Sequence, residues 1–189
     1  QELQSFFYFD HVGVGRAEDD WNRPVEWTLP ELKEAITTWD RTLGEAAWPS
    51  VFLGNHDLPR AVSYFGDDRP GYRRRSAKML ATLLLTLRGT PYVYQGDEIG
   101  MTNMLFETLD DFQDLSTIND VHEKVAAGMD RETALEHHRR LSRDHARTPM
   151  QWTAAEHADF TDGTPWLAVN PNHDRIHVEA AREDPESVW

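Results

Sequence analysis

A short apolar run that ends in a glycine and a polar triplet constrains this chain more than any other feature. Residues 51–53 are apolar, Gly54 ends the run, and Asn55, His56 and Asp57 follow directly. Apolar runs bounded by glycine are typical of buried parallel strands. In α/β barrels the reacting groups sit at the carboxyl ends of such strands. The sequence therefore predicts a strand here, with His56 and Asp57 as candidate functional residues at its end.

Strand and helix patterns alternate around this run. Residues 5–12 are rich in aromatic side chains and predict a strand, residues 28–44 and 73–88 have apolar side chains at helical spacing, and residues 90–95 predict a third strand. The order strand, helix, strand, helix, strand with short connections indicates two βαβ units and a parallel sheet. Residues 1–96 are therefore predicted to have an α/β fold.

The first of these helices has the clearest boundaries in the sequence. Thr28 is a good capping residue, and Glu31 three positions later completes a capping box. Pro30 is tolerated because it falls in the first turn, where backbone N–H groups lack helical partners in any case. Gly44 marks the end of the helix.

The pattern changes after the third predicted strand. Residues 97–170 contain no clear strand pattern, and their best helical pattern is at residues 131–141. Turn sequences such as Asp162-Gly163 and Asn170-Pro171 interrupt the rest. We therefore expect residues 97–189 to form a long, mostly helical insertion rather than more of the sheet.

Composition excludes several classes of function. The chain has 189 residues with a formal net charge of −14, so it lacks the basic surface that nucleic acids and anionic membranes require. No apolar run approaches the length of about 18 residues expected of a membrane-spanning helix. The absence of cysteine suits a reducing compartment, and we expect a cytoplasmic protein. The sequence indicates no oligomeric state.

Three ordered motifs resemble a known family. GNHDLPR at residues 54–60, GTPYVYQGDEIGMTN at residues 89–103 and SRDHARTPMQW at residues 142–152 resemble segments of the α-amylase family of glycoside hydrolases, in its α-glucosidase and oligo-1,6-glucosidase branch. The resemblance implies a partial (β/α)8 TIM barrel in which residues 1–96 supply strands six to eight with their helices. It further implies that residues 97–189 lead towards the last barrel helix and that strands one to five lie outside this chain.

The resemblance also implies roles for individual residues. Retaining glycosidases use a nucleophile and a general acid/base whose carboxyl groups lie about 5–5.5 Å apart. In this family those two acids sit on strands four and five, so neither is expected here. Asp57 matches a third acid that stabilises the oxocarbenium-like sugar, and His56 matches a residue that donates to hydroxyls of the same ring. Arg143 matches the arginine that closes over the sugar in the innermost pocket.

Each of these residues also has a purely structural interpretation. Asp57 could act as a turn residue before a proline, and Arg143 could form an ion pair with one of 33 acidic residues. Arg60 and Arg147 are nearby alternatives to Arg143, for which a structural role is favoured. The adjacent acids Asp97 and Glu98 are interpreted as loop residues, because adjacent positions at a strand end point different ways.

No metal or cofactor is expected. The nine histidines are scattered, and only His173 and His177 stand four residues apart. They follow a turn at residues 170–172, which argues against a shared helical face, and no third ligand is evident.

The sequence is thus interpreted as part of a retaining α-glucosidase that acts on small α-glucosides. A transglycosylating relative, such as a sucrose isomerase or a trehalose-forming enzyme, is one alternative, and a non-catalytic sugar-binding barrel is another. Relatives that isomerise sucrose carry an Arg-Leu-Asp-Arg motif where this chain has residues 12–16, Val-Gly-Val-Gly-Arg. Hydrolysis is therefore the favoured reaction. Ser116 stands where α-1,6-acting relatives often have an acid, so the preference between α-1,4 and α-1,6 linkages stays open.

Overall fold

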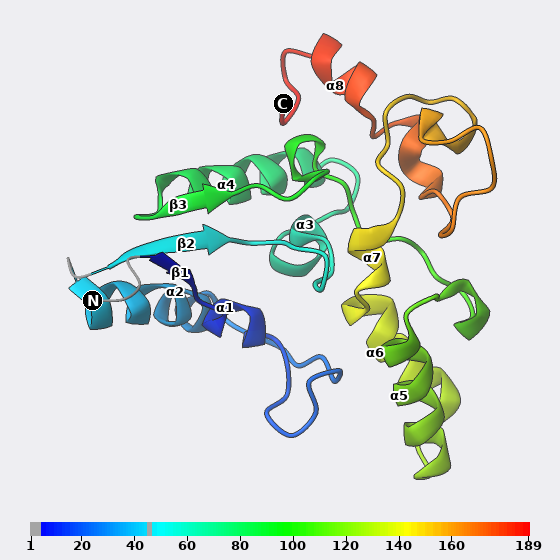
Figure 1. Cartoon of the computed structure of the whole chain (residues 1–189), viewed down its shortest axis with the longest axis horizontal. Coiled ribbons are helices and arrows are strands. Elements are labelled where there is room, and N and C mark those ends of the chain that lie inside the picture. Colours follow the sequence, from blue (N-terminus) through cyan, green and yellow to red (C-terminus); the bar gives the residue numbers. More distant parts are fainter. Residues whose placement is uncertain (1–4, 45–46) are drawn as a thin grey trace.

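The computed structural model describes residues 5–44 and 47–189. Its only sheet among these residues has three parallel strands in the order β1 (Ser5–Phe7), β2 (Trp48–Phe52) and β3 (Thr90–Tyr92). The long helices α2 (Leu29–Leu43) and α4 (Arg73–Thr86) connect these strands, as the alternating sequence pattern predicts. The α/β prediction for this part of the chain is confirmed (Figure 1).

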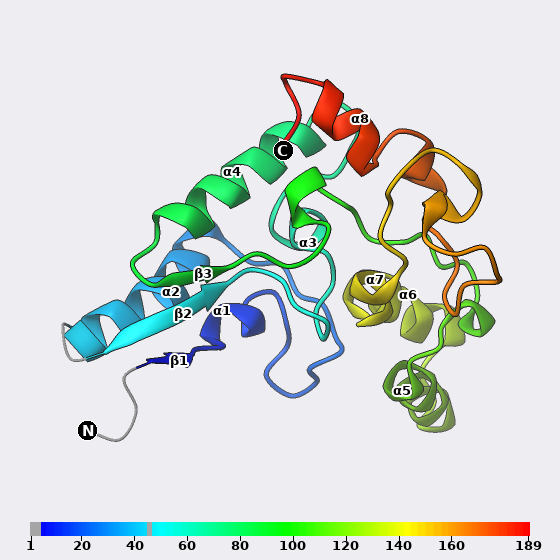
Figure 2. The same ribbon diagram turned by 45° about the horizontal axis from the view of Figure 1, so that its top comes forward.

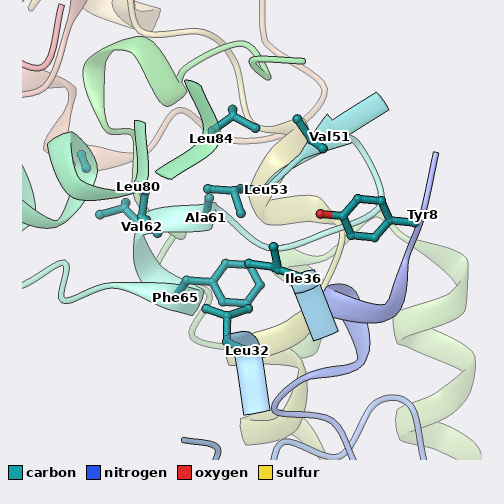
Figure 3. Close-up of a cluster of buried hydrophobic side chains, with 11 residues drawn as sticks. Tyr8, Leu32, Ile36, Val51, Leu53, Ala61, Val62, Phe65, Leu80 and Leu84 are labelled. Atoms are coloured by element: carbon teal, nitrogen blue, oxygen red, sulfur yellow. The ribbon is translucent and has the colours of Figure 1, made fainter. Parts of the chain in front are cut away.

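The main hydrophobic core lies between the sheet and these two helices. Val51 and Leu53 project from the β2 segment into a cluster to which α2, α4 and the short helix α3 (Ala61–Phe65) contribute (Figure 3). The helices contribute the buried residues Leu32, Ile36, Ala77, Leu80 and Leu84. Burial of apolar surface contributes roughly 25 cal/mol per Å², so this cluster stabilises the packing of the helices against β2. It therefore fixes the direction in which β2 delivers the residues that follow it.

The opposite face of the sheet carries aromatic side chains. Phe7, Phe9 and Tyr92 are 44%, 57% and 49% exposed. The ring of Phe7 lies against Phe52 and Tyr92, with centroid distances of 5.8 and 4.7 Å. No described helix covers these three residues, so one face of the sheet is packed and the other presents exposed aromatic surface.

The strands are shorter or shifted relative to the sequence-based boundaries. The strand predicted over residues 5–12 ends at Phe7, and helix α1 (Asp10–Gly13) follows. The chain turns there because the amide of Val12 donates to the carbonyl of Phe9 at 2.9 Å. β3 ends at Tyr92 rather than at residue 95, since the amide of Asp97 closes a turn on the carbonyl of Tyr94 at 2.9 Å.

Helix α2 begins as the capping-box pattern predicts. The Glu31 carboxylate accepts hydrogen bonds from both the amide and the hydroxyl of Thr28, the latter at 2.8 Å. Gly44 follows the last residue of the helix with φ of +49°, a conformation that glycine adopts without steric cost.

Helices dominate the second half of the chain, and β3 is the last strand. They are α5 (Leu115–Ala126), α6 (Arg131–Leu141), α7 (Asp144–Arg147) and α8 (Val178–Glu183), together with the short 3-10 helices η2 (Asp97–Ile99), η3 (Leu109–Asp111), η4 (Glu156–Asp159) and η5 (Pro171–Asp174). Helix α6 has the bounds that the sequence predicts. Helix α3 (Ala61–Phe65) and helix α5 were not predicted, and α5 buries the polar Thr117 beside Val121, which weakens its apolar periodicity.

Helices α5, α6 and α7 gather on the side towards which the strands point (Figure 2). A second hydrophobic core packs the segment before α5 against α5 and α6. Its buried residues include Phe106, Phe112, Val121, Ala134 and Leu135. In the part of the chain that the structure describes, no helix has the length and apolarity needed to cross a membrane.

Candidate active site

The polar triplet after β2 forms a tight turn at the carboxyl end of the sheet. The side-chain oxygen of Asn55 accepts a hydrogen bond from the amide of Asp57 at 2.8 Å. This bond turns the chain away from the core, and the Asp57 side chain is 48% exposed. His56 is 71% exposed, and its Nε2 lies 3.2 Å from Oδ2 of Asp57. The two residues predicted from the sequence therefore lie together on an open surface.

Two arginines of the α7 segment bind the same oxygen of Asp57. Nη2 of Arg147 lies 2.8 Å from Oδ1, and Nη1 of Arg143 lies 3.3 Å from the same atom. The arginines are four residues apart, so a helical turn brings them to one side. Nε of Arg147 also donates to the carbonyl of His56 at 2.8 Å. Arg143 thus contacts Asp57, and Arg147, for which the sequence favours a structural role, contacts it at the shorter distance.

Asp114 is a buried acid that shares these arginines. Its carboxylate accepts from Nε of Arg143 at 3.0 Å and from Nη2 at 2.5 Å, a two-pronged pairing that suits the planar guanidinium. Nη1 of Arg147 lies 3.9 Å from the same carboxylate. Asp114 also caps α5, because its Oδ1 accepts from the amide of Ser116 at 3.2 Å. The site is therefore a ring of two acids and two arginines.

Electrostatic interactions keep Asp114 and Arg143 ionised. Burial alone raises the pKa of Asp114, but hydrogen bonds from Arg143 and from the Ser116 amide outweigh it and leave the pKa below its usual value. The hydrogen bond to Asp114 raises the pKa of Arg143 further above its usual value. Both partners consequently stay charged at neutral pH, and Arg143 is held in place by a charged partner on α5.

Two residues near Asp57 fix the position of α7. Arg60 is 1% exposed, and its Nε donates to the carbonyl of His145 at 3.1 Å while Nη1 donates to the carbonyl of Gln95 at 2.7 Å. The Tyr94 hydroxyl donates to the carbonyl of Ala146 at 3.1 Å. Arg60 and Tyr94, which follow β2 and β3, therefore hold the backbone of α7 in place between the two arginines.

A cavity of about 320 Å³ opens beside these charges. Asp57, Asp114 and Arg143 line one part of it, and Phe9 and Trp21 contribute aromatic walls. Arg16 also lines the cavity and is 7% exposed, and its guanidinium lies 4.6 Å from the centroid of the Trp21 ring. Small-molecule sites combine such apolar walls with a few convergent polar groups, and their volumes begin at about 300 Å³.

Asp97 and Glu98 lie in a different part of the fold. Both line a groove of about 300 Å³ between α4 and the last two residues, and neither lines the cavity beside Asp57. The Glu98 carboxylate accepts from the amide of Gly96 at 2.7 Å, which stabilises the turn after β3. Burial raises the pKa of Asp97 to about 6.

No cluster of three histidine, aspartate or glutamate side chains within residues 5–44 and 47–189 could hold a metal ion. Nδ1 of His177 lies 2.7 Å from the carbonyl oxygen of His173, so this ring contacts backbone rather than its neighbour's ring.

Comparison with known proteins gives the family. The protein-family model described as the α-amylase catalytic domain matches residues 1–189. The chain belongs to the α-amylase family. The catalytic domains of this family are TIM barrels, and the three-stranded sheet described above is smaller than a complete barrel sheet.

Individual relatives of this α-amylase-family chain agree with that assignment. The oligo-1,6-glucosidase of Halalkalibacterium halodurans is 47% identical over 190 residues, which cover the whole of this chain and 33% of the relative. Among solved structures, the trehalulose synthase MutB matches with a TM-score of 0.95 and 47% identity, and an isomaltulose synthase from Klebsiella sp. LX3 matches with 0.96 and 42%. Each match covers 99% of this chain and 34% of the solved chain. The chain therefore spans about a third of the length of these relatives.

Sequence reasoning missed one member of the charged ring, Asp114, and favoured a structural role for another, Arg147. Asp114 gave no motif signal, although an acid directly before a helical stretch is a capping signature that was available. Arg147 was visible only as the second arginine of the motif at residues 142–152. Its spacing of four from Arg143 is the signal that could have raised its rank.

Proposed function

We propose that this chain is the part of an α-glucosidase barrel that carries strands six to eight, with residues 97–189 inserted after the last strand and leading towards the final helix. The proposed reaction is retaining hydrolysis of terminal α-glucosidic bonds in disaccharides and short oligosaccharides. The observation that carries the proposal is the exposed Asp57 carboxylate between two arginines at the edge of a cavity with aromatic walls. The family and the relatives named oligo-1,6-glucosidase support it.

In this proposal Asp57 stabilises positive charge on the reacting sugar. A glycosidic bond breaks through an oxocarbenium-like state, in which the ring carbon and ring oxygen become positive. A carboxylate fixed beside that ring binds the transition state more tightly than the neutral substrate, which is the requirement for catalysis. Oδ1 of Asp57 is occupied by the arginines, whereas Oδ2 contacts only His56 among the described side chains. Oδ2 is the oxygen that we assign to the sugar hydroxyls.

His56 and the arginines orient the sugar. The exposed His56 ring beside Asp57 can donate to a hydroxyl of the same ring. Arg143 presents N–H groups at the edge of the cavity, where vicinal hydroxyls would accept. The nucleophile and the acid/base lie outside these 189 residues in this proposal, on strands four and five.

Substituting the two arginines separately tests their part in sugar binding. In the enzyme that carries the complete barrel, we expect Arg143→Ala and Arg147→Ala each to weaken inhibition by glucose by about tenfold, the loss expected for one charge-assisted hydrogen bond. Inhibition constants for glucose are the measurement. Arg175→Ala is the matched control, because this arginine pairs with Asp174 on the surface. An unchanged inhibition constant in a folded variant would assign that arginine a purely structural role.

Sucrose isomerisation is a second candidate, because the two solved structures compared above are named trehalulose synthase and isomaltulose synthase. Another structure of that trehalulose synthase, MutB, holds its substrate sucrose. Residues 12–16 argue against isomerisation, since they carry a single charged residue, Arg16, where relatives that isomerise sucrose have an Arg-Leu-Asp-Arg motif.

Product analysis separates the candidate reactions. We expect the complete enzyme to convert sucrose mainly to glucose and fructose, because residues 12–16 lack the charged motif that would hold the fructose for re-addition. Chromatography of the digests is the measurement. Isomaltulose or trehalulose as the main product would establish the isomerase alternative. Sugar binding without turnover of any α-glucoside would instead establish the non-catalytic barrel.

A further inference from the structure

We propose that Asp114 is a positioning residue. Its negative charge offsets the positive charge of the two arginines, so that the charge of Asp57 remains available to stabilise the cationic sugar. This inference rests on the proposed function, because it concerns how that site stabilises a cationic sugar. It assigns a role in the reaction to the insertion helix α5, which otherwise has only a packing role.

The charges of the ring show why such a residue is needed. Asp57 has both arginines within 3.3 Å of one oxygen. Two cations on one carboxylate would reverse the local charge and oppose a positive sugar ring. Asp114 balances the ring at two acids and two arginines, and it makes the closer contacts with Arg143, at 3.0 and 2.5 Å. Arg143 is therefore drawn towards Asp114, and its contact with Asp57 is the longest of these hydrogen bonds, at 3.3 Å.

The placement of Asp114 is itself well supported. The residue is 5% exposed, and the Thr117 hydroxyl donates to its Oδ2 at 3.2 Å. Its amide and that of Gln113 donate to the buried carboxylate of Asp144, at 2.8 and 2.7 Å. Asp144 directly follows Arg143 in the chain. Two sets of hydrogen bonds therefore join the turn that carries Asp114 to the segment that carries Arg143. In one set, backbone amides of the turn donate to the Asp144 carboxylate, and in the other the Arg143 guanidinium donates to the Asp114 carboxylate.

Helix capping alone does not account for this arrangement. A cap at the start of α5 requires one acceptor for the Ser116 amide, which Oδ1 of Asp114 supplies. Asp130 caps α6 in the same way, accepting from the amide of Thr133 at 2.9 Å, and it has no arginine partner in the part of the chain that the structure describes. The two residues form a natural comparison: both cap a helix, and only Asp114 also faces the arginines.

The experiment removes the charge of each cap and keeps the cap. Asparagine caps helices about as well as aspartate, so Asp114→Asn and Asp130→Asn should leave α5 and α6 in place. Each variant is made in the enzyme that carries the complete barrel. The measurements are kcat and KM for p-nitrophenyl α-glucoside, and inhibition constants for glucose and for 1-deoxynojirimycin, a glucose-shaped amine that binds as a cation.

We expect Asp114→Asn to lower kcat by about 10- to 100-fold, the effect of removing a charged hydrogen-bond partner. KM should change far less, because the neutral ground state responds weakly to the local charge. Inhibition by the cationic iminosugar should weaken several-fold more than inhibition by glucose. Asp130→Asn should change none of these values. If Asp114→Asn fails to fold, Asp114→Ser provides a smaller capping residue without charge and is read in the same way.

Each other outcome is decisive. Asp114→Asn behaving like Asp130→Asn would overturn the proposal. So would a loss of affinity that is equal for glucose and the iminosugar and comes with a lower melting temperature, because that pattern indicates a structural role alone. If the unsubstituted enzyme neither hydrolyses α-glucosides nor binds glucose, the proposed function itself fails, and the inference about Asp114 fails with it.

Discussion

Asp57→Asn in the enzyme that carries the complete barrel is expected to lower kcat by roughly 10³-fold, equivalent to about 4 kcal/mol of transition-state stabilisation. The substitution keeps the shape of the side chain and removes the charge that faces the developing cation. It also leaves the two arginines with Asp114 as their one remaining acidic partner, so the net charge of the ring changes from neutral to positive. The measurement is kcat for an α-glucoside at saturating concentration.

The fold should tolerate this substitution. Asp57 is 48% exposed, and the turn that presents it is held by its backbone amide and Asn55 rather than by its carboxylate. A melting temperature within a few degrees of the unsubstituted enzyme is the check. Asp174→Asn, which disrupts an Asp–Arg pair on the surface, is the matched control and should retain full turnover. Full turnover in Asp57→Asn would refute the catalytic assignment of Asp57.

The 189-residue chain expressed alone is expected to show no glycosidase activity and no sharp unfolding transition. Its outer strands β1 and β3 pair only with β2 among the described residues, so each leaves one edge without partners. Phe7, Phe9 and Tyr92 expose aromatic surface on one face of the sheet. A sheet of three strands cannot close into the barrel that the family requires.

Two measurements check this expectation separately. Calorimetry of the monomeric chain tests stability, and a sharp two-state transition would show that the chain folds on its own. An α-glucoside assay tests activity, and turnover that Asp57→Asn abolishes would place the nucleophile and the acid/base within these residues.

The sequence predicted the parallel sheet and its two long helices because their signals are local. Thr28 and Glu31 sit side by side in the chain, and the apolar spacing of α4 is readable within a few turns. Boundaries at β1 and β3 were less accurate, since turns at Phe9 and Tyr94 depend on backbone hydrogen bonds that composition does not reveal.

The candidate site was predictable only in part, for a physical reason. Asp57 and His56 stand next to each other at the end of one strand, so a single motif reports both. The contact between Arg143 and Asp114 joins residues 29 positions apart in the chain, and that between Arg147 and Asp57 joins residues 90 apart. A single sequence carries no signal for such pairs. They arise from the packing of the helical segment against the sheet.

Asn103 joins the two ends of the helical excursion, the segment of residues 104–139 that contains α5 and most of α6. Its side-chain oxygen accepts from the amide of Arg60 at 2.9 Å, and its side-chain nitrogen donates to the carbonyl of Arg140 at 3.2 Å. The two ends of this segment therefore lie together next to Asn103 and the residues after β2, with Gly128 between α5 and α6. Length changes near Gly128 add little closure entropy, because the cost grows only with the logarithm of loop length. The excursion is thus free to lengthen, shorten or acquire new surface during evolution while the arginines at its foot keep their positions.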